Sequence, residues 1–338
     1  MTDTKKKILE WSNLMLLSSD QVEANEIKPL RQEASTREYF RLKNKNISYI
    51  GVFSPPETEL NEQFVFLSKF FRKEGVTVPE VIFSNTEEGL MLVQDFGDKS
   101  YQFTLNKENY HHLFSSAIDE MLNIQKCPYH PQIPILNEIQ IEKQMRLFEE
   151  WFLKGLLNLK ITKEEKLLIE NLYKEILKDL AQQPQVLCHF DFESRNLMVL
   201  EQGNTGVLDF QDATFGPIFL DPVSLFKDLY FDISEQEVND LIKEYVLKAS
   251  ELGLIERLSL KHVKRSFDLS GLQRQLRILG TLSRLHLDDR KSFRLRDLIK
   301  TLHFVIESCS RYSELKDVSE FFLKRISPLL HITLKEIS

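Results

Sequence analysis

The strings CHFDFESRNLM (residues 188–198), VLDFQD (residues 207–212) and GPIFLDP (residues 216–222) decide the fold predicted for this 338-residue chain. They carry six polar side chains at spacings that phosphoryl transfer can use: His189, Asp191, Asn196, Asp209, Asp212 and Asp221. A kinase needs one carboxylate that orients the attacking hydroxyl group and accepts its proton. It also needs oxygen ligands for the Mg²⁺ that neutralises charge between the terminal phosphates. The three strings therefore predict a phosphoryl-transfer site.

The first of these residues form the pattern His-x-Asp-x-x-x-x-Asn, in which Asp191 suits the hydroxyl-orienting role. Asn196 can turn its amide oxygen to a metal, and Asp209, after an apolar strand, suits the main Mg²⁺ carboxylate. The residues between them read as strand, polar turn and strand, a hairpin that brings Asn196 and Asp209 side by side. The alternative is a hairpin whose Asp and Asn residues only form turns and caps. The combination of pattern and hairpin favours the site.

This stretch resembles the catalytic and metal-binding loops of the aminoglycoside phosphotransferase-like kinases, which are relatives of the protein kinases. Residues 194–198, 208–213 and 216–221 resemble a narrower group, the bacterial anomeric kinases that phosphorylate N-acetylmuramate and N-acetylglucosamine at C1 during cell-wall recycling. ASTREYFR (residues 34–41) and GLQRQLRILG (residues 271–280) resemble the same group. The likeness therefore spans about residues 30–305.

The resemblance implies an α+β, two-lobed protein-kinase-like fold. Residues 1–97 would form a small N-terminal antiparallel β lobe with a helix, which binds nucleotide. Residues 98–338 would form a larger, mainly helical lobe with the catalytic and substrate groups. Besides Asp191, the resemblance implies catalytic-loop roles for His189 and Arg195, and a buttress role for Asp221. ATP would be contacted at its phosphates and adenine by Ser35, Thr36, Arg37, Gln94, Asp95 and Phe96, with Mg²⁺ on Asn196 and Asp209.

Three features depart from the usual kinase pattern. The predicted third strand, residues 47–53, lacks the lysine that holds the α- and β-phosphates, so Arg37, Arg41 and Lys43 are candidates for that task. Phe190 stands where the sugar kinases commonly have arginine, and Glu193 where they often have histidine. Glu193 and Asp212 are candidate acceptor contacts, and Glu193 leaves the identity of the acceptor open.

Arginines also lie on the predicted helix over residues 267–287: Arg274, Arg277 and Arg284. They could reach an acidic substrate such as the lactyl carboxylate of muramate. The default expectation is a charged face in contact with solvent.

Periodicity predicts helices over residues 5–17 and 59–74, and strands over 27–33, 38–42, 47–53, 79–83 and 90–93. From residue 107 the pattern is helical, with segments over 138–158, 163–182, 234–252, 267–287, 293–308 and 316–332. Thr162 suits an N-cap. Asp221, before Pro222, suits an N-cap as well as the buttress role.

Bulk properties exclude several classes of protein. The net charge of −7 argues against a nucleic-acid partner. Neither G-x-G-x-x-G nor the P-loop pattern occurs, which argues against dinucleotide-binding and P-loop folds. Cys127, Cys188 and Cys309 show no metal or disulfide spacing and suit buried thiols in a reducing cytoplasm. No apolar run approaches the ~18 residues of a membrane span.

We therefore predict a cytoplasmic, monomeric enzyme that uses ATP to phosphorylate C1 of N-acetylmuramate, N-acetylglucosamine or both. The resemblance implies a sugar-phosphate nucleotidyltransferase as its pathway partner. One alternative is a kinase for another small hydroxyl compound, such as an aminoglycoside, choline or a different sugar. Another is a nucleotide-binding pseudokinase scaffold, which the missing lysine suggests. The intact Asp191, Asn196 and Asp209 argue against that scaffold.

Overall fold

The computed structural model describes residues 3–30, 36–45, 47–256, 259–288, 291–292 and 294–337. The chain forms two compact units. Unit 1 comprises Met1–Cys127 and Arg195–Asp212, and unit 2 comprises Pro128–Ser194 and Ala213–Ser338. Unit 1 therefore includes helices and a hairpin that follow residue 97, so the lobe boundary placed there stays a prediction.

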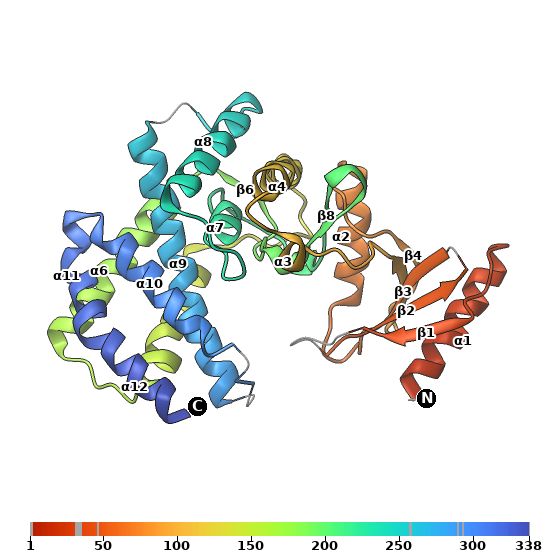
Figure 1. Cartoon of the computed structure of the whole chain (residues 1–338), viewed down its shortest axis with the longest axis horizontal. Coiled ribbons are helices and arrows are strands. Elements are labelled where there is room, and N and C mark those ends of the chain that lie inside the picture. Colours follow the sequence, from red (N-terminus) through yellow and green to blue (C-terminus); the bar gives the residue numbers. More distant parts are fainter. Residues whose placement is uncertain are drawn as a thin grey trace. The chain divides into compact units, whose positions relative to one another are not determined.

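A five-stranded antiparallel sheet of order β1-β2-β3-β5-β4 forms the centre of unit 1. Its strands are β1 (Glu26–Pro29), β2 (Glu38–Asn44), β3 (Ile47–Phe53), β4 (Val81–Asn85) and β5 (Leu90–Gln94). Figure 1 shows helix α1 (Asp3–Ser18), which was predicted over residues 5–17, lying along this sheet. Apolar residues of the helix and the strands bury one another there. A Cβ on Gly51 would lie 2.6 Å from Ile8 Cγ2, so glycine permits this close approach of helix and strand.

Helix α2 (Asn61–Lys73) buries Phe64, Leu67 and Phe71 on one face, as its period predicts. The ring of Phe210, in the short 3₁₀ helix η4 (Phe210–Asp212), stacks on Phe64 at 4.9 Å between centroids. Phe71 meets the same ring edge-on at 5.9 Å. These contacts hold Phe210, the residue after Asp209, against helix α2.

The predicted hairpin completes unit 1 and is confirmed. Its strands, β7 (Leu197–Val199) and β8 (Thr205–Val207), pair antiparallel and are joined by the 3₁₀ turn η3 (Glu201–Gly203). Helices α3 (Tyr101–Thr104) and α4 (Tyr110–Gln125) pack beside it. The buried hydroxyl of Tyr101 donates to the Leu113 carbonyl at 2.9 Å and lies 2.6 Å from the Thr205 hydroxyl.

Helix α9 (Leu260–Leu287) is the central element of unit 2. It contacts α5 (Glu138–Leu147), the π-helix η1 (Phe148–Leu156), α6 (Lys163–Leu180), α7 (Leu220–Phe226) and α10 (Asp297–Ser310). The other helices of this unit are α8 (Glu235–Glu251), η5 (Ser313–Leu315), α11 (Lys316–Phe321), η6 (Phe322–Ile326) and α12 (Ser327–Ile337). Because neighbours surround α9, Arg274 is only 3% exposed. The expected solvent-facing arginine face is wrong there, although Arg284 is exposed.

Two predicted helix starts have different outcomes. Thr162 caps α6 in a capping box with Glu165, as predicted. The N-cap role of Asp221 is wrong, because α7 begins after Phe219 and Asp221 lies in its first turn. The Asp221 carboxylate instead accepts hydrogen bonds from the backbone N–H groups of His189 and Phe190. All three cysteines are buried and unpaired, as expected.

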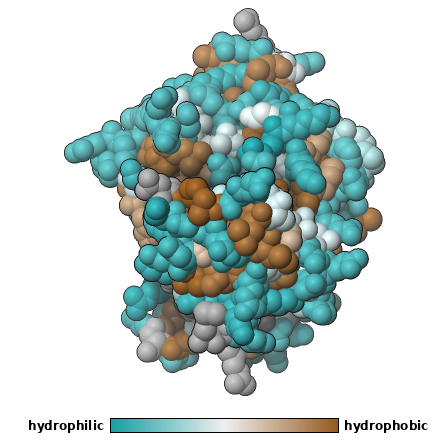
Figure 2. Space-filling model, turned by 90° about the vertical axis from the view of Figure 1, so that its right-hand side faces the viewer, coloured by the Kyte–Doolittle hydropathy of each residue, from teal (hydrophilic) through white to brown (hydrophobic). Residues whose placement is uncertain are grey.

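The surface mixes polar and apolar side chains. Leu14 and Leu17 of α1 and Val22 after it are more than half exposed. On the face drawn in Figure 2, polar residues separate the apolar patches. Within the part of the chain that the structure describes, no helix combines the length and apolar character needed to cross a membrane.

Candidate active site

The catalytic loop begins where the buried strand β6 (Gln185–Cys188) ends, and β6 pairs antiparallel with β9 (Thr214–Pro217). The next two backbone N–H groups, of His189 and Phe190, donate to the two carboxylate oxygens of Asp221 at 2.7 and 2.8 Å. Burial raises the pKa of Asp221, while the contacts with His189 and Phe190 oppose this shift. The buttress that the resemblance implied for Asp221 is therefore present in the structure.

The loop turns sharply at Phe190, whose φ of 78° lies in the left-handed region. This conformation is unfavourable for a bulky residue and persists only where its surroundings hold it. The paired hydrogen bonds to Asp221 supply that restraint. The position of Asp191, the next residue, thus depends on a buried carboxylate 30 residues later in the chain.

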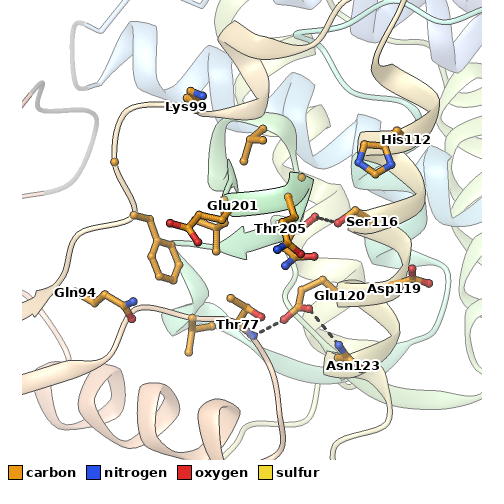
Figure 3. Close-up of a pocket in the computed structure, with 18 of the residues that line it drawn as sticks. Thr77, Gln94, Lys99, His112, Ser116, Asp119, Glu120, Asn123, Glu201 and Thr205 are labelled. Atoms are coloured by element: carbon orange, nitrogen blue, oxygen red, sulfur yellow. Dashed lines mark hydrogen bonds between the residues drawn. The ribbon is translucent and has the colours of Figure 1, made fainter.

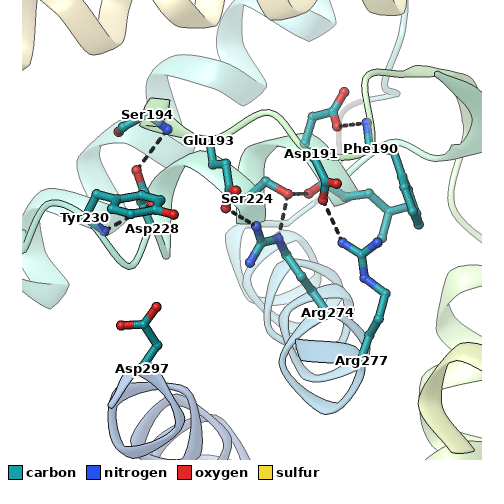
Figure 4. A network of polar contacts seen from close by, with 12 residues as sticks. Phe190, Asp191, Glu193, Ser194, Ser224, Asp228, Tyr230, Arg274, Arg277 and Asp297 are labelled. Atoms are coloured by element: carbon teal, nitrogen blue, oxygen red, sulfur yellow. Dashed lines mark hydrogen bonds and ion pairs between the residues drawn. The ribbon is translucent and has the colours of Figure 1, made fainter. Parts of the chain in front are cut away.

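Asp191, the predicted base, forms an ion pair with Arg277. The sequence analysis did not predict this pair. Arg277 Nη2 donates to Asp191 Oδ1 at 2.8 Å, and the guanidinium lies 4.3 Å from the centre of the Phe190 ring. The Asp191 side chain remains 29% exposed and that of Arg277 is 16% exposed. Figure 4 shows Arg277 and Arg274 projecting from one helix toward this loop. The ion pair places a cation against the predicted base.

Glu193, whose contact with the acceptor stays a prediction, forms a buried ion pair. Its Oε2 accepts from Arg274 Nη2 at 2.9 Å, and both side chains are 4% exposed. Arg274 Nε also donates to Ser224 Oγ at 2.7 Å. The backbone N–H of Ser194 donates to Asp228, whose pKa is raised by burial and by the charge of Glu193. These contacts hold the loop after Asp191 against α7 and α9.

The two predicted metal ligands, both in unit 1, lie at the same end of the hairpin. The backbone N–H of Leu208 donates to the Asn196 carbonyl at 2.8 Å, one residue before Asp209. Asp209 has a φ of 60°, a conformation that aspartate tolerates better than most residues. The predicted juxtaposition of Asn196 and Asp209 is confirmed, and their metal role stays a prediction. Asp212 is exposed at the end of η4.

The oxygens near Asp209 suit Mg²⁺. Gln211 Nε2 donates to Asp209 Oδ1 at 2.8 Å, while the buried Gln211 Oε1 has no hydrogen-bond partner within the described structure. Carboxylate and amide oxygens are the ligands that Mg²⁺ prefers, often one or two together with phosphates and water. Among the described residues no group of three or more His, Cys, Asp and Glu could hold a metal alone.

Of the three predicted phosphate contacts, Ser35 lies outside the described residues. Thr36 Oγ1 donates to Glu59 Oε1 at 2.7 Å. Arg37 is 2% exposed, donates from Nε to Ser54 Oγ at 3.0 Å and pairs with Glu59 at 3.1 Å. In this structure the Arg37 charge is therefore neutralised within unit 1.

The predicted adenine contacts, Gln94, Asp95 and Phe96, follow the last strand of the sheet. Asp95 is held by Arg41, with Nε to Oδ2 at 2.6 Å and Nη2 to Oδ1 at 3.0 Å. Burial disfavours ionisation, but hydrogen bonds from Ser48 and Arg41 lower the pKa of Asp95 overall. Arg41, a candidate phosphate clamp, thus rigidifies the segment after the sheet.

A cavity of about 1190 Å³ within unit 1 adjoins the same segment. Figure 3 shows its walls, which include Thr77, residues 94–99, helix α4 and residues 199–205. Burial raises the pKa of Glu120, which accepts hydrogen bonds from the Thr77 N–H and from Asn123 Nδ2. The lining includes the predicted adenine contacts but neither the predicted phosphate contacts nor the predicted metal ligands.

The chain is similar to known proteins over most of its length. A family model described as "Phosphotransferase enzyme family" matches residues 26–258. The N-acetylmuramate/N-acetylglucosamine kinase of Pseudomonas putida is 30% identical over 300 residues, which cover 89% of this chain and 88% of the relative. The protein of that name from Neisseria meningitidis serogroup B is 31% identical over 288 residues, covering 84% and 85%.

Solved structures share the fold at low identity. The choline kinase LicA from Streptococcus pneumoniae is 13% identical with a TM-score of 0.63, covering 90% of this chain and 100% of that chain. The ADP-bound aminoglycoside phosphotransferase APH(2'')-Ib is 15% identical with a TM-score of 0.59, covering 89% and 98%. The predicted protein-kinase-like α+β fold is confirmed.

Proposed function

Because the chain belongs to the phosphotransferase enzyme family, we propose that it transfers the γ-phosphoryl group of ATP to the C1 hydroxyl of N-acetylmuramate, N-acetylglucosamine or both. The observation that carries the proposal is the catalytic loop. Asp191 sits partly exposed on a loop that Asp221 restrains and is ion-paired with Arg277. Three relatives at 30–31% identity over most of the chain are named for these two sugars.

Asp191 orients the acceptor and takes its proton. In the proposed reaction the anomeric oxygen forms a bond to the γ-phosphorus, the bond to the bridging oxygen of ADP breaks, and the proton passes to the Asp191 carboxylate. An anomeric hydroxyl is more acidic than an ordinary alcohol, so its deprotonation needs only modest assistance from the base. General-base assistance contributes typically ~10²–10⁴-fold to the rate.

Asn196 and Asp209 would hold Mg²⁺, and Gln211 orients the Asp209 carboxylate. When bound, the metal neutralises charge on the terminal phosphates. The backbone of Gln94, Asp95 and Phe96 would receive adenine. Thr36 and Arg37 would lie over the phosphates, and β3 lacks the usual phosphate-binding lysine.

The acceptor and the position of the phosphate in the product test the proposal. Purified protein with ATP, Mg²⁺ and either sugar should yield a glycosyl phosphate, whose phosphorus couples to the anomeric proton in NMR spectra. The Asp191→Asn variant serves as the matched control and should form product far more slowly. Phosphate on another oxygen would refute the C1 assignment. Phosphorylation of choline or an aminoglycoside alone would refute the acceptor class, and ATP binding with no turnover of any acceptor would support the scaffold.

A sugar 1-phosphate is the substrate class that a nucleotidyltransferase consumes, so we place such an enzyme next in the pathway. The monomeric state and the cytoplasmic location are proposals that rest on the resemblance. Light scattering of the purified protein tests the first, and fractionation of cells tests the second.

A further inference from the structure

The two arginines that α9 presents to the catalytic loop have different surroundings. Arg274 is 3% exposed and ties Glu193 and Ser224 together, an arrangement that braces the loop. Arg277, one helical turn later, contacts Asp191, the residue assigned to the chemistry. Figure 4 shows both side chains reaching the loop from the same helix. Arg277 is therefore the member of the pair that can act on substrate.

Arg277 has unused hydrogen-bonding capacity. A guanidinium carries five N–H donors. Of these, Nη2 donates to Asp191, and the buried Nε has no partner within the described structure. The Phe190 ring, 4.3 Å below, supports the plane of the guanidinium and supplies no oxygen acceptor. A buried donor without a hydrogen-bond partner is energetically unfavourable, so a bound anion that accepts a hydrogen bond from Nε would stabilise this group.

We propose that Arg277 selects acceptors that carry a carboxylate, by exchanging its ion pair with Asp191 for one with the acceptor. This inference rests on the proposed function. N-acetylmuramate differs from N-acetylglucosamine by a lactyl ether whose carboxylate matches the fork of an arginine. An acidic acceptor replaces the contact that Arg277 loses and leaves Asp191 Oδ1 to receive the hydroxyl proton. A neutral acceptor must weaken the Arg277–Asp191 pair without replacing it.

Two other roles for Arg277 predict different kinetics. If Arg277 only braced the catalytic loop, its replacement would slow both sugars by the same factor. If it bound the γ-phosphate, its replacement would also raise the KM for ATP. Selection of the acceptor carboxylate predicts instead a loss confined mainly to N-acetylmuramate and visible mainly in its KM.

The test compares kcat and KM of the full-length enzyme for the two sugars in the wild type, Arg277→Gln and Arg277→Lys. Lys261→Gln, which removes a charge at an exposed position on the same helix, is the matched control and should match the wild type. We expect Arg277→Gln to lower kcat/KM for N-acetylmuramate by about 10- to 100-fold, the range of a charged hydrogen bond, and to change N-acetylglucosamine much less. Arg277→Lys keeps the charge and should recover part of the loss.

Equal losses for the two sugars in Arg277→Gln would overturn the selectivity role while leaving the proposed function intact. A wild-type enzyme that phosphorylates neither sugar would refute the proposed function, and the inference with it. If Arg277→Gln does not fold, Arg277→Lys decides the question. A reduced preference for N-acetylmuramate in that variant supports the proposal, and an unchanged preference refutes it.

Discussion

Replacement of Asp221 by asparagine tests whether a buried carboxylate positions Asp191, the proposed catalytic base. The wild-type carboxylate accepts two backbone N–H bonds, at 2.7 and 2.8 Å, and is fully buried. Hydrogen bonds to a charged group contribute about 1.5–3 kcal/mol each. Asparagine keeps one oxygen and turns its NH₂ group toward a backbone N–H, so one bond is lost and the other is weakened. Relief of the carboxylate's desolvation offsets part of this loss, and we expect destabilisation by about 2–4 kcal/mol.

The same change should reduce catalysis. Without both bonds to Asp221, Phe190 is no longer held at a φ of 78°, and Asp191 moves with it. A displacement of about 1 Å in a reacting group can reduce the rate by ~10²-fold. We therefore expect kcat to fall by about two orders of magnitude while the KM for ATP changes little.

Urea unfolding and steady-state kinetics of Asp221→Asn measure the two effects. Asp240→Asn, an exposed aspartate of the same unit that pairs with Lys243, is the matched control. A variant with the stability and kcat of the control would refute the argument that Asp221 restrains the loop. A loss of stability with unchanged kcat would refute the link from the loop to Asp191.

Four further predictions follow from the structure. Asp191→Asn should lower kcat by ~10²–10⁴-fold and leave ATP affinity, measured by calorimetry, nearly unchanged. Asp209→Asn should raise the Mg²⁺ concentration for half-maximal activity at least about tenfold, and an unchanged Mg²⁺ titration would exclude Asp209 as a ligand. Gly280→Ala should destabilise unit 2 by about 1–3 kcal/mol, because its Cβ would lie 2.3 Å from the Leu147 backbone, whereas Gly271→Ala, with 3.7 Å to Val223, should be tolerated. The pKa of Asp95 is lowered in the folded state, so its stabilising contribution is present above about pH 4, the unfolded value, and is lost as pH falls through the folded pKa. The destabilisation of Asp95→Asn should therefore shrink in acid, and a pH-independent difference in unfolding free energy would contradict this.

Much of unit 1 followed from local sequence pattern. The period-2 runs of β2, β3 and β5, the period of α2 and the hairpin between Asn196 and Asp209 were all predicted near their observed bounds. The alternation of a strand and the residues of a turn depend on a few neighbouring positions. A short stretch of sequence is therefore enough to predict a strand or a hairpin. The predicted helix over 138–158 was less accurate, because it is an α-helix that becomes a π-helix at Phe148.

The sequence by itself determined the candidate residues for the proposed chemistry, because His189, Asp191, Asn196 and Asp209 stand in one short span whose spacing is readable. Only the tertiary structure decided what surrounds them. The Arg277–Asp191 pair joins residues 86 positions apart, and Arg274 pairs with Glu193 across 81. The arginine side of α9 was expected to face solvent, but packing on several sides of the helix buries Arg274 and brings Arg277 against the loop. Whether a helix is buried on several sides depends on elements that are distant in the chain. The local hydrophobic period of the helix therefore does not predict it.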